Sequence, residues 1–163
     1  MDPRLSLTRD ELDALVRTHA ADAAAWRPHV THDPAERSYA LLHRDARCEV
    51  YVIGWMDGHD TGWHDHDDAA AAIAVVEGLV VEERFALGGP VIRRYGRGDA
   101  VSVPRTAIHR VRHGGGGPAT TIHAYSPPLA RVGSYEVGEE GTLLRHSRDA
   151  EAPLEPVGLA AAA

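Results

Sequence analysis

From residue 37 onward the chain consists of short β-type runs separated by turn residues, and this pattern restricts its fold more than any other feature. The runs cover residues 48–55, 73–85 with a break at Gly78, 91–95, 100–103, 108–112 and 120–125. Many short strands at close spacing are typical of a sandwich or a closed barrel, and not of alternating strands and helices. The sequence therefore predicts an all-β fold in the form of a small β-barrel.

The first part of the chain carries a helical pattern instead. Thr8 is followed three residues later by Glu11, a capping box that satisfies two backbone donors at the start of a helix. Apolar side chains then recur at helical spacing, at Leu12, Leu15 and Val16. A second, shorter helix is predicted around residues 22–26, ended by Pro28 because proline cannot continue a helix. These N-terminal helices would lay one apolar stripe against the barrel.

A chain of 163 residues corresponds most simply to one domain. We predict a single domain over residues 1–163, with a helical region at 1–30 and a barrel core at 37–128. Residues 150–163 end in an alanine run without core-forming periodicity, and we expect them to form a poorly ordered tail.

Charge and cysteine content narrow the partners and the compartment. The formal net charge of −7 argues against a nucleic-acid partner, because phosphate binding requires a basic surface. No apolar run approaches the roughly 18 residues of a membrane span, and no N-terminal targeting segment is recognisable. The single cysteine, Cys48, cannot form an internal disulfide, which fits a reducing compartment. We expect a cytoplasmic protein. The sequence carries no signal of the oligomeric state, and we expect a monomer.

The segment His64-Asp65-His66 is the first candidate for chemistry. Side chains alternate between the two faces of a strand, so His64 and His66 point the same way and Asp65 points the opposite way. Two imidazoles that converge in this manner can occupy two adjacent positions on one metal. A solvated polar turn explains an isolated histidine pair about equally well.

The surroundings of this pair favour the metal. Glycines, a proline and a third histidine follow at set intervals, in the order Gly58, His64, His66, Gly78 and then Gly98, Pro104, His109. This order resembles the two sequence blocks of the cupin superfamily. The resemblance implies a cupin barrel in which the glycines turn tight corners between strands and the proline starts the second metal-bearing strand. It also implies that His64, His66 and His109 bind one metal.

One position departs from the cupin pattern. Cupins commonly carry a glutamate ligand where this chain has Ala71, so the ligand set would be three neutral imidazoles. Three protein ligands leave coordination positions open, as in catalytic metal sites, and an uncompensated divalent ion would attract a thiolate or a carboxylate. Zinc would activate water and iron(II) would activate dioxygen, and the ligands alone do not choose between them. Asp67 and Asp68 either support the ligands or form a solvated bend.

The last predicted strand carries a second constellation. Thr121, His123 and Tyr125 share one face of it, and a hydroxyl, an imidazole and a phenol in a row can form a hydrogen-bonded relay. The other interpretation of Tyr125 is a core tyrosine with a satisfied hydroxyl. The segment 121–128, together with the upstream histidine pair, resembles the cysteine dioxygenase family of thiol dioxygenases. That family has a Ser-x-His-x-Tyr-Ser-Pro-Pro segment, in which Thr121 here replaces the serine.

The resemblance covers residues 37–128 and implies that iron(II) and O2 oxidise a small thiol, foremost L-cysteine, to its sulfinic acid. Tyr125 would hydrogen-bond substrate or oxygen, with its hydroxyl oriented by His123. Mammalian members carry a cysteine, crosslinked to this tyrosine, at the position of Ala71, so the resemblance is to the uncrosslinked bacterial type.

Arg37 is the best match to the arginine that holds the substrate carboxylate in this family, although it is placed across a gap. A guanidinium pairs with a carboxylate through two parallel hydrogen bonds, whereas the other interpretation is a surface arginine at the start of a strand. If Arg37 does not reach the site, the substrate would be another thiol acid such as 3-mercaptopropionate. Two further hypotheses stay open: a three-histidine cupin of different metal chemistry, and a non-enzymatic ligand-binding cupin.

Overall fold

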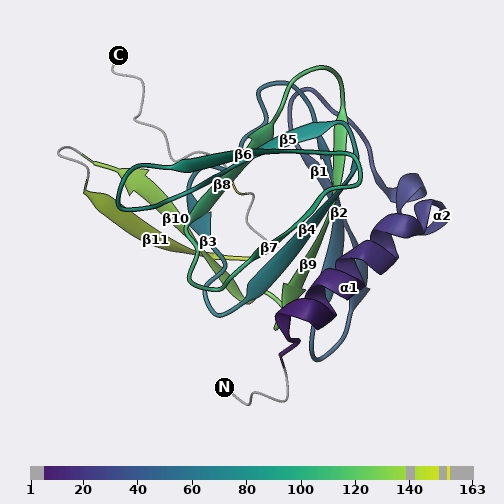
Figure 1. Ribbon diagram of the computed structural model, residues 1–163, viewed down its shortest axis with the longest axis horizontal. Coiled ribbons are helices and arrows are strands. Elements are labelled where there is room, and N and C mark those ends of the chain that lie inside the picture. Colours follow the sequence, from purple (N-terminus) through teal and green to yellow (C-terminus); the bar gives the residue numbers. More distant parts are fainter. Residues whose placement is uncertain (1–5, 139–141, 151–153, 155–163) are drawn as a thin grey trace.

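The protein is an all-β barrel preceded by two helices, as predicted, in a computed structural model that describes residues 6–138, 142–150 and 154 (Figure 1). One sheet has five strands, in the order β1 (Ser38–Arg44), β2 (Glu49–Trp55), β9 (Ala119–Ser126), β4 (Ala70–Glu77) and β7 (Ala100–Val103). The other has six, in the order β11 (Leu143–Asp149), β10 (Arg131–Val137), β3 (His64–Asp65), β8 (His109–His113), β5 (Leu79–Arg84) and β6 (Val91–Gly96). Paired neighbours within both sheets are antiparallel.

Helix α1 (Arg9–Ala21) lies across the outer face of the five-stranded sheet (Figure 1). It begins at the predicted capping box, in which the backbone N–H of Glu11 donates to Oγ1 of Thr8 at 3.2 Å. The backbone N–H of Thr8 donates in return to the Glu11 carboxylate at 2.7 Å. Helix α2 (Ala23–Trp26) confirms the second predicted helix, but Pro28 does not end the helical segment. A 3₁₀ turn (Arg27–His29) follows, and proline is tolerated there because an early turn needs no donor at that position.

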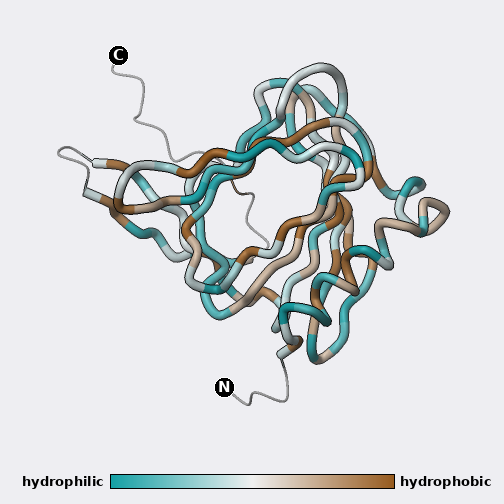
Figure 2. Tube along the Cα trace, in the orientation of Figure 1, coloured by the Kyte–Doolittle hydropathy of each residue, from teal (hydrophilic) through white to brown (hydrophobic). Residues whose placement is uncertain are grey.

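The five-stranded sheet separates two apolar clusters, because alternate residues of each strand face opposite ways. In Figure 2 the hydropathy accordingly changes within single strands and within α1. The outer cluster joins the helices to the sheet through Leu12, Val16, Trp26, Val50, Val52, Ala72, Ala74, Ile122 and Ala124. The inner cluster fills the barrel with Trp55, Ala69, Ala71, Ile73, Val75, Val80, Val103, Val111, Ala119 and Tyr125. Every residue of β9 is buried, since this strand lies between the two clusters.

The strand series does not end near residue 125, where the sequence pattern stops. Strand β10 pairs with β3, so that Ser134 lies opposite His64, and β11 then pairs with β10. Most of β11 is exposed, and its residues are mainly charged and polar, which removes the apolar alternation that would have revealed it. The sheet that carries His64 and His109 is therefore completed by chain beyond residue 128.

Two predictions concern the ends and the surface of the chain. Apart from residues 150 and 154, the tail predicted at 150–163 lies outside the described residues. Within the part of the chain that the structure describes, no helix combines the length and the apolar character needed to cross a membrane.

Candidate metal centre

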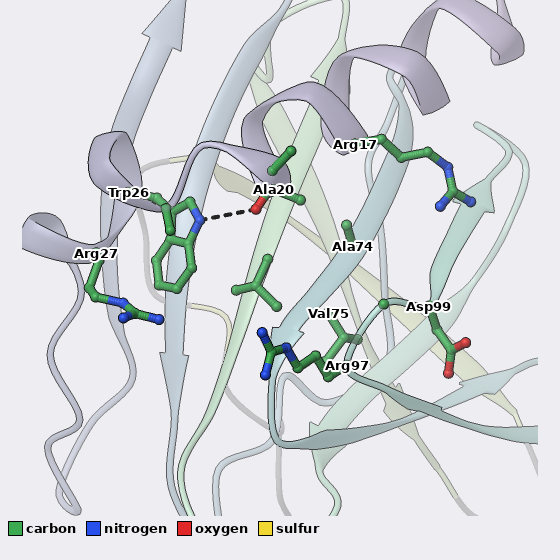
Figure 3. Close-up of a pocket in the computed structure, with 12 residues that line it drawn as sticks. Arg17, Ala20, Trp26, Arg27, Ala74, Val75, Arg97 and Asp99 are labelled. Atoms are coloured by element: carbon green, nitrogen blue, oxygen red, sulfur yellow. Dashed lines mark hydrogen bonds between the residues drawn. The ribbon is translucent and has the colours of Figure 1, made fainter.

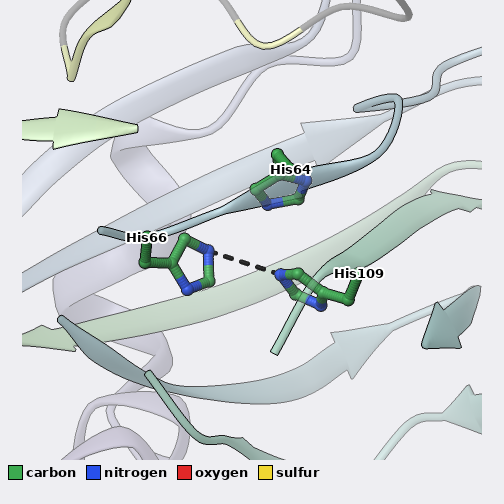
Figure 4. A group of neighbouring side chains, drawn as sticks. All are labelled: His64, His66 and His109. Carbon is green, nitrogen blue, oxygen red and sulfur yellow. Dashed lines mark hydrogen bonds between the residues drawn. The ribbon is translucent and has the colours of Figure 1, made fainter. Parts of the chain in front are cut away.

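His64, His66 and His109 converge inside the barrel, as predicted (Figure 4). His64 and His109 lie directly opposite each other in the pairing of β3 with β8, and His66 follows the end of β3. The ring centroids are 4.4 Å apart for His64 and His109, 5.0 Å for His66 and His109, and 5.1 Å for His64 and His66. All three side chains are 3% exposed or less. Their ligand atoms lie within 4.8 Å of one another, which is the separation expected around one ion.

The hydrogen bonds of the rings direct free nitrogens toward the centre. Nδ1 of His64 lies 3.1 Å from the carbonyl oxygen of Gly62, and Nδ1 of His109 lies 3.0 Å from Oε1 of Glu82. Both acceptors require a proton on Nδ1, so Nε2 of each ring carries a lone pair. Nε2 of His66 lies 3.4 Å from that of His109.

Burial, together with the neighbouring His109 ring, places the pKa of His64 and of His66 well below the usual value for histidine. These are neutral imidazoles whose lone pairs converge, and the donor set fits a divalent transition metal.

Asp65 points away from the centre, as strand alternation predicts. Its carboxylate accepts two hydrogen bonds from Arg145, at 2.7 and 2.9 Å, and one from the hydroxyl of Tyr135 at 2.6 Å. Burial opposes ionisation of Asp65, but the Arg145 and Tyr135 hydrogen bonds outweigh it and lower the pKa to about 2. Asp67 and Asp68 are exposed, and Asp67 pairs with Arg145 at 2.9 Å, so they form a solvated bend and do not support the ligands.

The predicted relay is present on the inner face of β9. The hydroxyl of Tyr125 lies 3.0 Å from Nδ1 of His123, and Nε2 of His123 lies 2.9 Å from Oγ1 of Thr121. The indole N–H of Trp55 donates to the same Oγ1 at 2.8 Å. Burial lowers the pKa of His123 to about 3, so its ring is neutral, with one donor and one acceptor nitrogen.

These contacts fix the direction of the relay. Thr121 accepts from Trp55, and its own proton has no acceptor among the described residues other than His123. The satisfied arrangement therefore has Thr121 donating to Nε2 of His123, which leaves the ring proton on Nδ1 to be donated to the Tyr125 oxygen. Burial raises the pKa of Tyr125, so its hydroxyl keeps its proton. That proton is then available to a bound molecule.

The relay and the metal cluster meet at one cavity of about 210 Å³. The ring of Tyr125 lies 5.1 Å from that of His66, centroid to centroid. The cavity is lined by Arg37, Tyr39, Tyr51, Ile53, His66, Tyr125, Leu129, Val132, Ala150 and Leu154. Arg37 thus faces the site, with its guanidinium carbon 5.1 Å from the centre of the Trp55 ring. Of the predicted site residues, Arg37, His66 and Tyr125 line this cavity. His64 and His109 adjoin His66, and His123 and Thr121 continue the relay from Tyr125.

Comparison with known proteins identifies the family. The family model for cysteine dioxygenase type I matches residues 4–137. The chain belongs to this family. Curated relatives are cysteine dioxygenase type 1 of Bos taurus, 22% identical over 135 residues, and that of Homo sapiens, 20% identical over 135 residues. Each match covers 74% of this chain and 66% of the relative, slightly less than two thirds of its length.

Solved structures confirm the cupin fold. A protein of Thermus thermophilus superposes with a TM-score of 0.56 at 19% identity, over 63% of this chain and 93% of that one. The cupin domain of Schizosaccharomyces pombe Cnp3 gives a TM-score of 0.52 at 13% identity, over 61% of this chain and 65% of that one.

Position 71 bears on the crosslink of mammalian cysteine dioxygenases. Ala71 lies directly opposite Tyr125 in the pairing of β4 with β9, so a residue here is a neighbour of the relay tyrosine. Cys48 lies just before β2, where its sulfur is 3.5 Å from the carboxylate of Asp45. The residue beside Tyr125 is therefore an alanine without a thiol.

A larger hollow elsewhere lacks the chemistry of the site. It measures about 400 Å³ and lies between the helices, β4 and the turn before β7 (Figure 3). Alanines, valines and arginines dominate its lining. Arg17 pairs with Asp13, and Arg27 pairs with Glu77, both at 2.8 Å. No histidine or cysteine lines it among the described residues, so size alone does not locate the site.

Sequence reasoning missed two residues that hold the site together. Trp55 anchors the far end of the relay, and Glu82 accepts a hydrogen bond from His109. Glu82 had a signal: Val80 and Glu82 alternate on β5, so an acidic residue occupies a position on the inward face of the barrel. A carboxylate is seldom buried without a partner, so an acidic residue on the inward face of a strand indicates a hydrogen-bond or charge partner inside the barrel.

Proposed function

We propose that this member of the cysteine dioxygenase family is an iron(II)-dependent thiol dioxygenase that converts a small thiol, foremost L-cysteine, to its sulfinic acid. Both atoms of O2 are transferred to sulfur, which loses four electrons, so no further reductant is consumed. The observation that carries the proposal is the cavity in which the Tyr125 hydroxyl, His66 of the metal cluster and Arg37 meet.

A donor set of three neutral imidazoles would suit iron(II), which would supply the activation of dioxygen when bound. His64, His66 and His109 would hold the ion. The protein residues around it orient the substrate. Tyr125 donates its proton to a bound group, and the relay from Trp55 holds that hydroxyl in place.

The cavity lining favours a small thiol acid. Arg37 can pair with a carboxylate through two hydrogen bonds, and the described lining residues include no carboxylate that would hold a substrate ammonium group. Ile53, Leu129 and Val132 make part of the remaining wall apolar. The pairing with Arg37 suits L-cysteine and 3-mercaptopropionate alike and disfavours cysteamine, which has no carboxylate. Thiol and O2 are the proposed partners, and a monomeric, cytoplasmic protein remains a prediction.

Oxygen consumption tests the proposal. Protein reconstituted anaerobically with iron(II) is offered L-cysteine, 3-mercaptopropionate and cysteamine, and the product is identified by mass spectrometry. We expect oxygen uptake with L-cysteine and a product heavier by two oxygen atoms. Uptake with 3-mercaptopropionate alone would reassign the substrate. Absence of uptake with every thiol at full iron occupancy would refute the dioxygenase and point to another cupin chemistry.

Strand β8 offers a matched control for the metal ligands. His109 and His113 are both buried on the same face of this strand, but His113 hydrogen-bonds to the carbonyl oxygen of Gly117 at 2.6 Å and lies outside the cluster. His109→Ala should abolish iron binding and activity, whereas His113→Ala should retain the iron content of the folded fraction. Full activity of His109→Ala would remove this residue from the ligand set.

A further inference from the structure

Glu82 is a buried carboxylate that contacts a residue of the metal cluster. It lies on β5 with 2% of its surface exposed, and its Oε1 is 3.0 Å from Nδ1 of His109. Arg84, two residues along the same strand, donates from Nε to the same oxygen at 2.9 Å. A buried charge is strongly unfavourable unless it is paired and hydrogen-bonded, and these two contacts supply the pairing.

Arg84 is itself held in place. Its Nη2 donates to the carbonyl oxygen of Ser102 at 2.7 Å. This bond links β5 to β7, the edge strand of the five-stranded sheet. In the pairing of β5 with β8, Arg84 lies opposite His109, so the arginine, the carboxylate and the ligand form one compact group. The orientation of Glu82 therefore follows from the strand register.

The three cluster histidines have unequal partners behind their rings. Nδ1 of His109 faces a carboxylate, and Nδ1 of His64 faces the neutral carbonyl of Gly62. Nδ1 of His66 is buried and has no hydrogen-bond partner among the described residues. A carboxylate that accepts the ring proton raises the basicity of the opposite nitrogen more than a carbonyl does.

We propose that Glu82, anchored by Arg84, is a positioning residue that makes His109 the strongest of the three metal ligands. The glutamate ligand absent at position 71 is thus replaced by a carboxylate one imidazole ring away, so negative charge reaches the metal through His109. This inference rests on the metal site of the proposed function, and it does not depend on which substrate is oxidised.

Strand β5 supplies a control in the adjacent residue. Glu83 is also buried and paired with arginine, with Arg112 donating to it at 2.9 Å, but it lies on the other face of the strand. Glu82→Gln keeps the size of the side chain and an oxygen acceptor, and removes the charge. Glu83→Gln makes the same chemical change without touching the cluster.

The test measures the affinity of the metal-free protein for cobalt(II) alone, by competition with a chromophoric chelator. Glu82→Gln is expected to bind cobalt about 10-fold more weakly, within the range for such partners, and Glu83→Gln to bind it as the wild type does. In proton spectra of the cobalt proteins, one shifted ring N–H resonance should move in Glu82→Gln and none in Glu83→Gln. A purely structural role for Glu82 would move neither quantity.

Equal affinity and unchanged ring N–H resonances in Glu82→Gln would overturn the proposal. If that variant does not fold, Glu82→Asp takes its place, because it keeps the charge beside Arg84 and withdraws the oxygen from His109 by one methylene. It should show the same weaker binding. Since cobalt binding requires neither dioxygen nor thiol, this test stands even if the thiol dioxygenase assignment fails. If the wild-type protein oxidises a thiol but Glu82→Gln binds cobalt as tightly as the wild type does, only the role of Glu82 is refuted.

Discussion

The two faces of strand β9 are buried to the same degree but covered in different ways. On the outer face, Ile122 and Ala124 pack against the helices in an apolar cluster. On the inner face, Thr121, His123 and Tyr125 are joined by hydrogen bonds and end at the cavity. Apolar burial tolerates many side chains of similar size, whereas a buried polar row requires each donor to meet an acceptor. Burial alone therefore does not mark a functional residue, and the identity of its partners does.

The largest expected effect lies on the outer face. Ile122→Ala should lower the free energy of unfolding by about 3 kcal/mol, because it leaves a cavity beneath helix α1. Denaturant unfolding followed by circular dichroism measures this loss. Turnover per bound iron should not change, since the substituted side chain faces away from the relay. A loss of turnover per bound iron in the fully folded variant would show that the two faces of β9 are coupled.

Tyr125→Phe tests the inner face at the cavity. The variant should lower turnover about 100-fold, close to 2.7 kcal/mol in the activation barrier, because the proton donated to the bound group is lost. Metal content should stay at the wild-type level, measured by elemental analysis. Loss of the metal would mean that the tyrosine supports the ligands and not the substrate.

The Tyr125→Phe variant also tests how turnover depends on pH. Burial lowers the pKa of His123 to about 3 and raises that of Tyr125 above its usual value. The relay therefore stays neutral from about pH 5 to pH 9. The ratio of wild-type to variant turnover should be flat over this range. A ratio that changes steeply near neutrality would show that one of these groups titrates there.

The candidate site residues were more predictable from sequence than the residues and strands that hold them in place. The His64 and His66 pair and the relay follow from strand alternation, which is a local property, and the resemblance to the cupin sequence blocks implies His109 as the third ligand. The positions of Glu82 beside His109 and of β10 beside β3 depend on the register between strands far apart in sequence. Glu49 is a further example: it is fully buried, pairs with Arg44 at 2.6 Å, and no periodicity revealed it.

Arg37 lines the cavity at the inner face of the sheet and provides a test of substrate specificity. Arg37→Ala should raise KM for L-cysteine about 30-fold, equivalent to about 2 kcal/mol for a lost charged hydrogen-bond pair. KM for cysteamine should change less than twofold, because that thiol has no carboxylate. Steady-state oxygen uptake with both substrates provides the comparison. Equal changes would assign Arg37 to shaping the cavity through its contact with Trp55.

The smallest effect is expected at the far end of the relay, at Thr121. Thr121→Val keeps the shape of the side chain but removes the acceptor of the Trp55 indole and the donor to His123. The unpaired indole should cost about 1–2 kcal/mol of stability. Without the threonine proton, His123 can place its own proton on Nε2 and accept from Tyr125, which turns the tyrosine hydroxyl away from the cavity.

Turnover of Thr121→Val should therefore fall about 10-fold, a fraction of the loss in Tyr125→Phe, because the hydroxyl is misdirected and not removed. Thr121→Ser is the matched control, since serine keeps the hydroxyl and occupies this position in the family pattern. It should retain nearly full turnover. Equal losses in the serine and valine variants would show that the methyl group matters and that the direction of the relay does not. Equal turnover in the valine variant and the wild type would mean that the cavity orients Tyr125 without help from the strand that carries it.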